Sequence, residues 1–173
     1  MLEKFTAELT GIPRYELFMV GFFVIIVIFP LIKLFIRYRH RKKTEDTIGA
    51  LASNMASLTP EDFFELRGRK CHGKGAPMAG KAYDFPGVYI LYNQSKKMHY
   101  VGQSLRVFDR VNNHFTGKGN GDVYADYKYG DLFDIRMIAI DGSGYTYLND
   151  LERDTIMTYK AFSKGYNKTR GNL

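Results

Sequence analysis

The chain has 173 residues and a formal net charge of +7, with 25 Lys and Arg against 18 Asp and Glu. Its single cysteine, Cys71, excludes an intramolecular disulfide and agrees with a reducing compartment for the soluble part. The histidines lack the spacing of a zinc site; they are His40, His72, His99 and His114. Disulfide scaffolds and zinc-finger classes are therefore excluded.

An apolar stretch near the amino terminus is predicted to cross a membrane. Residues 17–36 carry one charge, Lys33, whose long side chain can reach the interface. About 20 such residues span a bilayer, and membrane helices tolerate a proline such as Pro30. A buried core helix would rarely be apolar all round over this length. A cleaved signal peptide is disfavoured because acidic residues precede the stretch and basic residues follow it.

A basic cluster follows this span and predicts its orientation. Its members are Arg37, Arg39, Arg41, Lys42 and Lys43. Before the span only Lys4 and Arg14 are basic, so the positive-inside rule places residues 1–16 outside the cytoplasm and the rest of the chain inside. The cluster is expected to bind anionic lipid, to help hold DNA, or to serve only as a stop-transfer flank. Charge alone does not separate these roles.

The next part of the chain is predicted to connect the membrane span to a folded domain. Residues 37–58 are predicted to form a basic juxtamembrane linker. Residues 59–84 are predicted to form a short helix followed by a glycine-rich linker. The helix begins at Thr59, a capping hydroxyl that precedes a proline and two acidic residues, and it runs through Leu66. Five glycines and prolines between Gly68 and Gly80 indicate a loop.

Two tyrosine tripeptides lie in neighbouring strand-like runs. Gly87-Val88-Tyr89 opens the first run and Tyr100-Val101-Gly102 closes the second, with the polar turn 93–97 between them. The two runs, Val88–Tyr92 and His99–Val101, are predicted to form a hairpin, so residues on one face become neighbours. Tyrosines in a hairpin can also be simple strand formers.

The segment after the hairpin is predicted to be a helix over 105–115. Its apolar residues recur with a helical period, and Arg110 and His114 lie one turn apart on one face. A guanidinium beside an imidazole can hold a phosphate. The alternative is an ordinary solvated helix face.

A third strand over 133–140 and a helix over 148–162 complete the predicted domain. Glu152 lies within the apolar stripe of that helix, where a lone carboxylate is costly and needs a cation, either an arginine or a metal. The expected fold is α/β: a small three-stranded antiparallel sheet flanked by helices and preceded by one transmembrane helix.

The motifs in this order resemble those of the GIY-YIG nucleases: the two tyrosine tripeptides, then Arg110, His114, Glu152 and Asn167. The resemblance covers about half of the chain, from Phe85 to Asn172. Valine replaces isoleucine at positions 88 and 101, and each change keeps a β-branched residue on a strand. Residues 85–173 are thus identified as a GIY-YIG nuclease domain.

The resemblance implies phosphodiester hydrolysis with one divalent metal, Mg²⁺ or Mn²⁺, held by Glu152. It implies that Tyr89 takes the proton from the attacking water, which requires a pKa well below the usual value of about 10. Tyr100 would position that water or a phosphate oxygen, and Arg110 would clamp the phosphate.

The remaining site residues have less specific expected roles. His114 would donate to the phosphate or assist proton transfer, and Asn167 would hold the phosphate or Tyr89 through its amide. DNA contacts are also expected from Gly102, Gln103, Ser104, Lys118, Lys168 and Arg170. The glycine-rich segment 117–121 trails a helix and lacks the context of a phosphate loop, so we expect a mobile loop there.

These features predict a membrane-anchored, metal-dependent DNA endonuclease in the inner membrane of a bacterial or phage-infected cell, with its nuclease domain in the cytoplasm. A location at the membrane favours action on entering phage or plasmid DNA, in defence or superinfection exclusion. One alternative is a nuclease for DNA repair, recombination or mobile elements. The other is a catalytically silent DNA-binding membrane protein, although the intact set of catalytic positions argues against silence.

Overall fold

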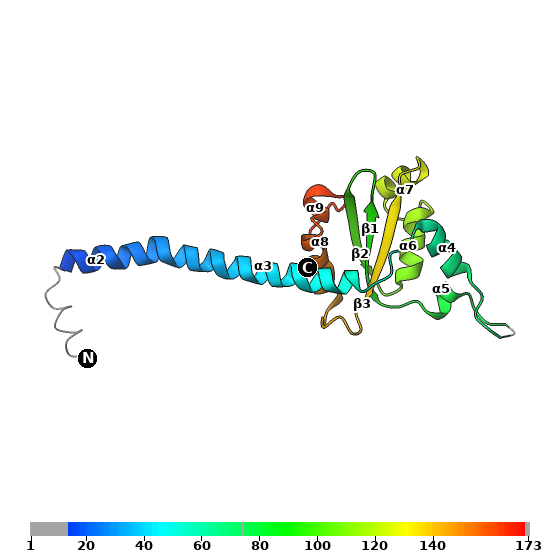
Figure 1. Cartoon of the computed structure of the whole chain (residues 1–173), viewed down its shortest axis with the longest axis horizontal. Coiled ribbons are helices and arrows are strands. Elements are labelled where there is room, and N and C mark those ends of the chain that lie inside the picture. The colour runs from blue at the N-terminus through cyan, green and yellow to red at the C-terminus, as the bar shows by residue number, and fades with distance from the viewer. Residues whose placement is uncertain (1–13, 74, 172–173) are drawn as a thin grey trace. The chain divides into compact units, whose positions relative to one another are not determined.

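A computed structural model describes residues 14–73 and 75–171, coloured along the chain in Figure 1. The chain divides into two compact units, Met1–Lys43 and Thr44–Leu173. Each unit has its own architecture. The second contains the sheet and every predicted catalytic residue.

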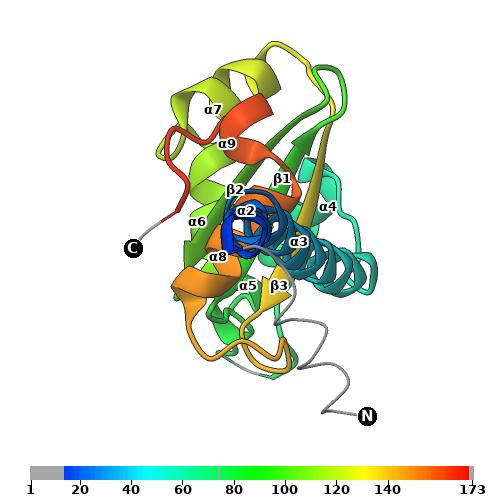
Figure 2. The same cartoon turned by 90° about the vertical axis from the view of Figure 1, so that its left-hand side faces the viewer.

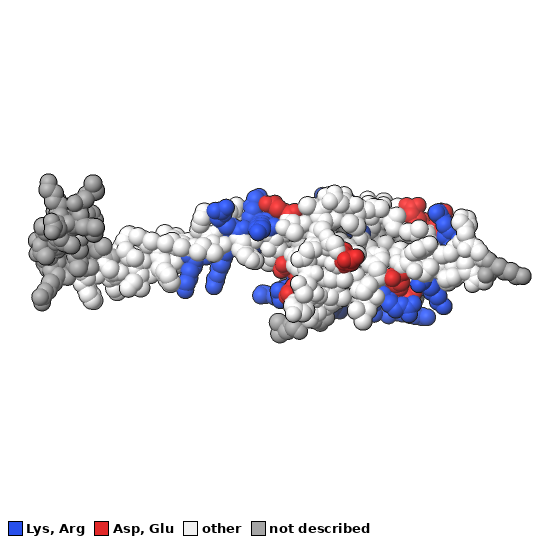
Figure 3. Space-filling view, turned by 90° about the horizontal axis from the view of Figure 1, so that it is seen from below, with Lys and Arg blue, Asp and Glu red and all other residues white. Residues whose placement is uncertain are grey.

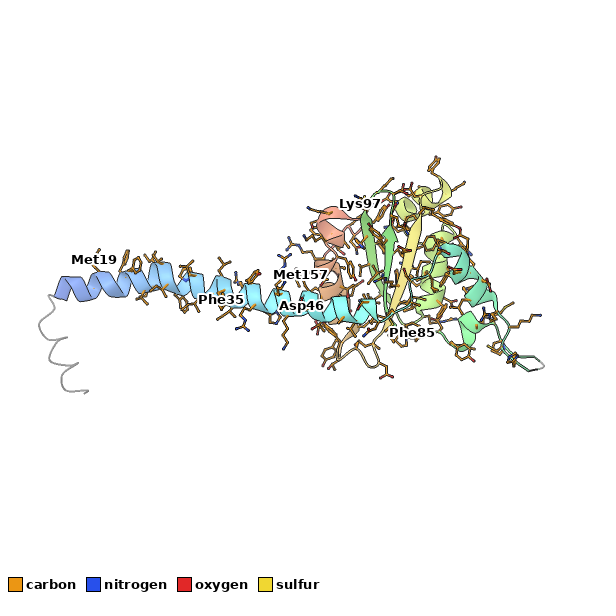
Figure 4. The ribbon with its side chains drawn as sticks, viewed as in Figure 1. Met19, Phe35, Asp46, Phe85, Lys97 and Met157 are labelled. Atoms are coloured by element: carbon orange, nitrogen blue, oxygen red, sulfur yellow. The ribbon has the colours of Figure 1, made fainter. Side chains whose placement is uncertain are left out.

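The described part of the first unit is an exposed apolar helix. It comprises α2 (Arg14–Phe23), a π-helical turn η1 (Val24–Ile28) and the first part of α3 (Phe29–Ser53). The π turn lies just before Pro30, whose ring crowds the preceding turn and lacks an N–H donor. Met19 and Phe35, labelled in Figure 4, stand out from this helix.

Within the described ranges, one helix, Gly21–Ser53, is long and apolar enough to cross a membrane. Its most apolar window has a mean hydropathy of 2.1 and none of it is buried. Figure 3 shows this uncharged stretch in white, followed by clustered Lys and Arg in blue. A signal sequence or the core helix of a soluble protein can have the same length and composition. The expected apolar helix is therefore present, as a candidate membrane span.

The last part of α3 belongs to the second unit. Thr44, Ile48 and Ala52 recur at intervals of four residues, so they share one helix face, and all three are buried. The apolar pair packs in a cluster with residues of the sheet and of helix α8 (Leu148–Thr158). Residues 37–58, expected to form a linker, are thus helical up to Ser53, and the compact unit begins at Thr44.

The sheet has three antiparallel strands, as predicted. They are β1 (Gly87–Asn93), β2 (Met98–Ser104) and β3 (Phe133–Ala139), in the order β2-β1-β3. The central strand β1 pairs Tyr89 with Gly102 of β2 and with Met137 of β3. Alternation along β1 then directs Tyr89 and Leu91 to one face of the sheet and Val88 and Ile90 to the other.

Helices cover both faces of this sheet (Figure 1). Helices α4 (Pro60–Gly68) and α6 (Val107–Phe115) pack on the face that holds Tyr89, while α8 and α9 (Ala161–Lys164) pack on the other. Figure 2 shows α7 (Gly121–Lys128) and α9 at the end of the sheet where the β1–β2 hairpin turns. Lys97 lies in that turn, and Phe85 lies near the opposite end (Figure 4).

Both outer strands have partners on their outer sides. Leu58 exchanges two backbone hydrogen bonds with Ile135 of β3, over 3.0 and 2.8 Å. On β2, the Tyr166 N–H donates to the His99 carbonyl over 2.9 Å, and the Asn167 side chain pairs with the backbone of Val101. Neither outer strand is therefore a fully open edge.

The helix boundaries follow local capping chemistry. Helix α4 has the predicted cap, in which the Thr59 hydroxyl accepts from the Asp62 N–H, and it continues to Gly68. The helix predicted over 148–162 ends at Thr158, because Lys160 adopts a left-handed conformation with φ of 53° before α9 begins. The loop predicted over 68–80 contains a short antiparallel bridge between Lys70 and Met78 and leads into α5 (Ala79–Ala82).

Candidate active site

Tyr89 is almost fully buried, with 1 % of its area exposed. Its ring lies over its cross-strand neighbour Gly102: a Cβ atom at position 102 would lie 2.3 Å from the Tyr89 hydroxyl oxygen and 2.6 Å from Cζ. These distances are far below van der Waals contact. Gly102, expected to contact DNA, therefore provides the space that the Tyr89 phenol occupies, which links the two tripeptides physically.

His114 is fully buried and contacts Tyr89 directly. Its Nε2 lies 2.9 Å from the Tyr89 hydroxyl oxygen, and the backbone N–H of Asn120 donates to its Nδ1 over 2.9 Å. Because Nδ1 accepts, a neutral His114 carries its proton on Nε2 and donates it to the Tyr89 oxygen. Gly119 permits this approach, since a Cβ atom there would lie 2.7 Å from Nδ1. The segment 117–121, expected to be mobile, thus orients the imidazole.

Tyr100 and Arg110 lie beside this pair. The ring centroid of Tyr100 is 6.1 Å from that of Tyr89 and 4.7 Å from that of His114. Arg110 is exposed on α6, and its charge acts on both Tyr89 and His114. The structure therefore brings together four of the six predicted catalytic residues on the α6 face of the sheet.

Burial dominates the protonation of the two buried groups. It raises the pKa of Tyr89 above the usual value, and the neighbouring Tyr100 adds to this, while Arg110 acts in the opposite direction. Burial and then the Arg110 charge lower the pKa of His114 to about 4. At neutral pH both side chains are therefore uncharged, which agrees with a His114 that accepts at Nδ1.

Asp84 holds the start of helix α6 and was not predicted from the sequence. One carboxylate oxygen accepts from the Phe108 N–H over 2.9 Å and the other from the Asp109 N–H over 3.4 Å. Asp84 thus satisfies backbone donors in the first turn of the helix that carries Arg110 and His114. It lies 24 residues before Phe108, so no local capping motif could reveal it.

Glu152 is buried, with 7 % of its area exposed, as its place in the apolar stripe predicts. The Gln103 Nε2 donates to a Glu152 oxygen over 3.0 Å and to the Asn149 side-chain oxygen over 2.7 Å. Gln103 is the cross-strand neighbour of Val88, so it points to the α8 face of the sheet. The Glu152 carboxylate therefore lies on the opposite face of the sheet from the phenols of Tyr89 and Tyr100.

The oxygen atoms around Gln103 fit a hard divalent cation. Carboxylate and amide oxygens are the protein ligands that Mg²⁺ and Mn²⁺ prefer, and Mg²⁺ commonly uses one or two carboxylates and keeps several waters. Among residues 14–73 and 75–171 there is no group of three or more His, Cys, Asp or Glu placed to hold a metal. Of the two side chains that Gln103 contacts, Glu152 could supply a carboxylate ligand and Asn149 an amide oxygen.

Asn167 contacts the edge strand rather than Tyr89. Its side-chain oxygen accepts from the Val101 N–H over 2.9 Å and its amide donates to the Val101 carbonyl over 2.7 Å. Gly165 allows this segment to approach β2, since a Cβ atom there would lie 2.2 Å from the His99 carbonyl oxygen. Asn167 therefore holds the strand between Tyr100 and Gly102.

The remaining residues expected to contact DNA are spread around the domain. The Ser104 hydroxyl accepts from the Arg106 N–H and donates to the Arg106 carbonyl, each over 2.9 Å, which closes the turn before α6. Lys118 is exposed next to the segment that orients His114. Lys168 pairs with Asp122 at 3.4 Å, and the Arg170 guanidinium lies 5.3 Å from the Phe162 ring centroid.

Comparison with known families agrees with this geometry. Residues 85–167 match the family model of the GIY-YIG catalytic domain. Comparisons with curated proteins and with solved structures gave no match. The carboxyl-terminal part of the chain is thus a GIY-YIG catalytic domain, in which a three-stranded sheet and its helices carry the site. This family consists of endonucleases, which generally use divalent metals, and DNA is the substrate that such a domain implies.

Proposed function

We propose that this chain is a membrane-anchored, divalent-metal-dependent DNA endonuclease. The observation that carries the proposal is the buried Tyr89–His114 pair beside Tyr100 and Arg110, within a GIY-YIG catalytic domain. A module that only binds DNA has no need of a buried phenol whose oxygen accepts from an oriented imidazole. Such an arrangement suits a group that changes its protonation during a reaction.

Tyr89 is proposed as the group that accepts a proton from the attacking water. In the free protein it is a neutral phenol, because burial raises its pKa. Positive charge must enter the site before it can ionise, and Arg110 is the residue that already acts in this direction. The phenolate would then accept a charge-assisted hydrogen bond from His114 Nε2. His114 therefore supports Tyr89 as a donor instead of taking up a proton.

Arg110 and Tyr100 are proposed to hold the scissile phosphate. Arg110 is exposed, and its guanidinium fork matches the oxygens of a phosphate. Tyr100 is partly exposed and presents a hydroxyl beside it. Donors fixed before the substrate arrives stabilise the charge that develops on the phosphate at little reorganisation cost.

Glu152 is proposed to hold the divalent metal, Mg²⁺ or Mn²⁺. Gln103 orients the carboxylate by donating to one of its oxygens, and Asn149 shares the same donor. A bound divalent ion would stabilise negative charge on the phosphate and the departing oxygen. The Tyr166–Asn167 segment covers the outer side of β2 at His99 and Val101. We therefore propose that the substrate meets the Glu152 side and the Tyr100 side together at the Gly102–Ser104 end of the strand.

The anchor is proposed to select which DNA the enzyme meets. The basic residues Arg37, Arg39, Arg41, Lys42 and Lys43 follow the apolar helix and are exposed, so they suit the anionic cytoplasmic leaflet. A nuclease held there meets DNA as it crosses the inner membrane. We therefore propose entering phage or other foreign DNA as its target, in defence or superinfection exclusion.

Replacement of Glu152 by glutamine tests the chemistry. Glu152→Gln keeps the volume and a hydrogen-bond partner for Gln103 but removes the charge that holds the metal, so cleavage with Mg²⁺ should fall by at least about 10²-fold. The matched control is Asp150→Asn, which removes a charge from an exposed ion pair on the same helix. It should cut like the wild type.

The melting temperature and DNA affinity of the same two variants complete the test. Both variants should stay folded and bind DNA. If Glu152 instead belongs to a buried ion pair, Glu152→Gln would be destabilised by about 3–5 kcal/mol. A destabilised Glu152→Gln protein that still cuts DNA would contradict the assignment.

A further inference from the structure

A two-stranded arm projects from the second unit between α4 and α5 (Figure 1). We define the arm as residues 69–73 and 75–79. Its strands are joined by the Lys70–Met78 bridge, by the Cys71 N–H to the Pro77 carbonyl at 3.2 Å, and by the Ala79 N–H to the Arg69 carbonyl at 2.8 Å. The arm is thus two short antiparallel segments joined by one isolated β-bridge and the hydrogen bonds on either side of it.

The arm and its flanks carry charge of one sign. From Arg67 to Tyr83 the sequence contains five Lys and Arg and no Asp or Glu. Arg69, Lys70 and Lys81 are all exposed. Arg69 lies 3.3 Å from Glu65, but both side chains are solvated, and such pairs contribute little. These three cations therefore remain accessible to an anionic ligand.

The root of the arm is attached to the helix that carries the catalytic residues. Arg67, at the end of α4, lies 3.2 Å from Asp109 of α6, which directly precedes Arg110 in the chain. Gly80 packs on Arg67, since a Cβ atom at Gly80 would lie 2.3 Å from the Arg67 Cγ atom. Helices α4, α5 and α6 also pack on one another. The arm thus extends from the same helical layer as Arg110.

We propose that Arg69, Lys70 and Lys81 bind the phosphate backbone of duplex DNA beside the catalytic site. This inference rests on the proposed nuclease function and assigns its substrate-binding surface. Lys and Arg that contact phosphates supply affinity without reading sequence, and all three of these cations are exposed. Lipid headgroups also carry phosphate, but the attachment of the arm to α6 favours the DNA that Arg110 would hold.

The salt dependence of DNA binding tests this proposal. The full chain in detergent is titrated with a labelled 30-base-pair duplex at salt concentrations between 50 and 200 mM. EDTA is present throughout, because it removes divalent metal and so prevents metal-dependent cleavage. Each lost phosphate contact lowers the slope of log affinity against log salt by about 0.9. The arm variant combines Arg69→Gln, Lys70→Gln and Lys81→Gln. From 50 to 200 mM salt, its DNA affinity should fall by a factor that is about 40 times smaller than the factor by which the wild-type affinity falls.

A charge-matched variant separates the arm from net charge. Lys128→Gln, Lys160→Gln and Lys164→Gln together remove three exposed cations from α7, the turn after α8, and α9. This control should change the slope much less than the arm variant. Lys70→Gln alone should lower the slope by about 0.9, a smaller perturbation with little risk to folding.

Two outcomes would overturn the proposal. In the first, the arm variant has the wild-type salt slope, as expected if the arm faces lipid. In the second, the control lowers the salt slope as much as the arm variant does. Cleavage of the same duplex by the wild type with Mg²⁺ is measured separately. A wild type that cuts while the arm variant keeps its slope would refute only the arm. A wild type that never cuts while the arm variant loses slope would refute only the nuclease.

Discussion

Replacement of Gly102 by alanine should abolish the proposed nuclease activity while leaving most of the fold intact. The new Cβ atom would lie 2.3 Å from the Tyr89 hydroxyl oxygen and 3.2 Å from its Cε2. Tyr89 has no free space, because it is 1 % exposed and contacts His114 at 2.9 Å. Either the phenol or strand β2 must then move. Overpacking of this kind typically costs about 1–3 kcal/mol.

The functional effect of Gly102→Ala should exceed the effect on stability. A shift of about 1 Å in a positioned group can reduce a rate by about 10²-fold, and here it also separates Tyr89 from His114. Single-turnover cleavage with saturating Mg²⁺ and the melting temperature are measured on the same protein. Gly49→Ala is the control, because a Cβ atom at this α3 position meets nothing within 4 Å. A Gly102→Ala protein that cuts at the wild-type rate would refute the proposed role of the Tyr89 position.

Three further predictions concern protonation and the anchor. His114 has a folded pKa of about 4, below its unfolded value near 6.5, so its contribution to stability is present above pH 6.5 and is lost as the pH falls toward 4. Chemical denaturation of the wild type should show a loss to which His114 contributes on the order of 3 kcal/mol. His114→Gln should remove this contribution and leave the part due to His99, whose pKa burial also lowers to about 4. A chain shortened to begin at Thr44 should still cut DNA in vitro but lose any protection against phage; loss of cutting with the fold intact would place the first unit in the active site. An alkaline phosphatase fused to the carboxyl end of the full chain should be inactive and a cytoplasmic reporter active, and the reverse pattern would contradict the predicted orientation.

The sequence predicted the sheet and the facing of its key residues well. The two tripeptides identify a hairpin because strand alternation and a polar turn are local properties, and the register indeed places Gly102 opposite Tyr89. The burial of Glu152 follows equally from helical periodicity, and the structure confirms it. Strand alternation also predicts that Tyr100 and Gln103 face opposite sides of β2. What periodicity does not encode is which helix covers which face, so the position of Glu152 on the Gln103 side depends on the tertiary fold.

Contacts that depend on the backbone or on distant parts of the chain could not be predicted. The Asn120 N–H that orients His114 carries no side-chain signal, and any residue but proline could supply it. Asp84 caps α6 across a hairpin, far outside the window in which capping motifs operate. The basic composition of residues 37–58 predicts a juxtamembrane linker and does not reveal that Ile48 and Ala52 are buried, because their burial depends on the tertiary fold.

The outer sides of β2 and β3 have a consequence for crowding. Membrane anchoring confines copies of a protein to two dimensions and raises their local concentration, which favours pairing between exposed strands of different copies. Here Leu58 is hydrogen-bonded to the backbone of Ile135. Tyr166 is hydrogen-bonded to the His99 carbonyl, and the Asn167 side chain to the backbone of Val101. The backbone groups at His99 and Val101 of β2 and at Ile135 of β3 are therefore already paired within the chain, which shortens the edge that a neighbouring copy could extend.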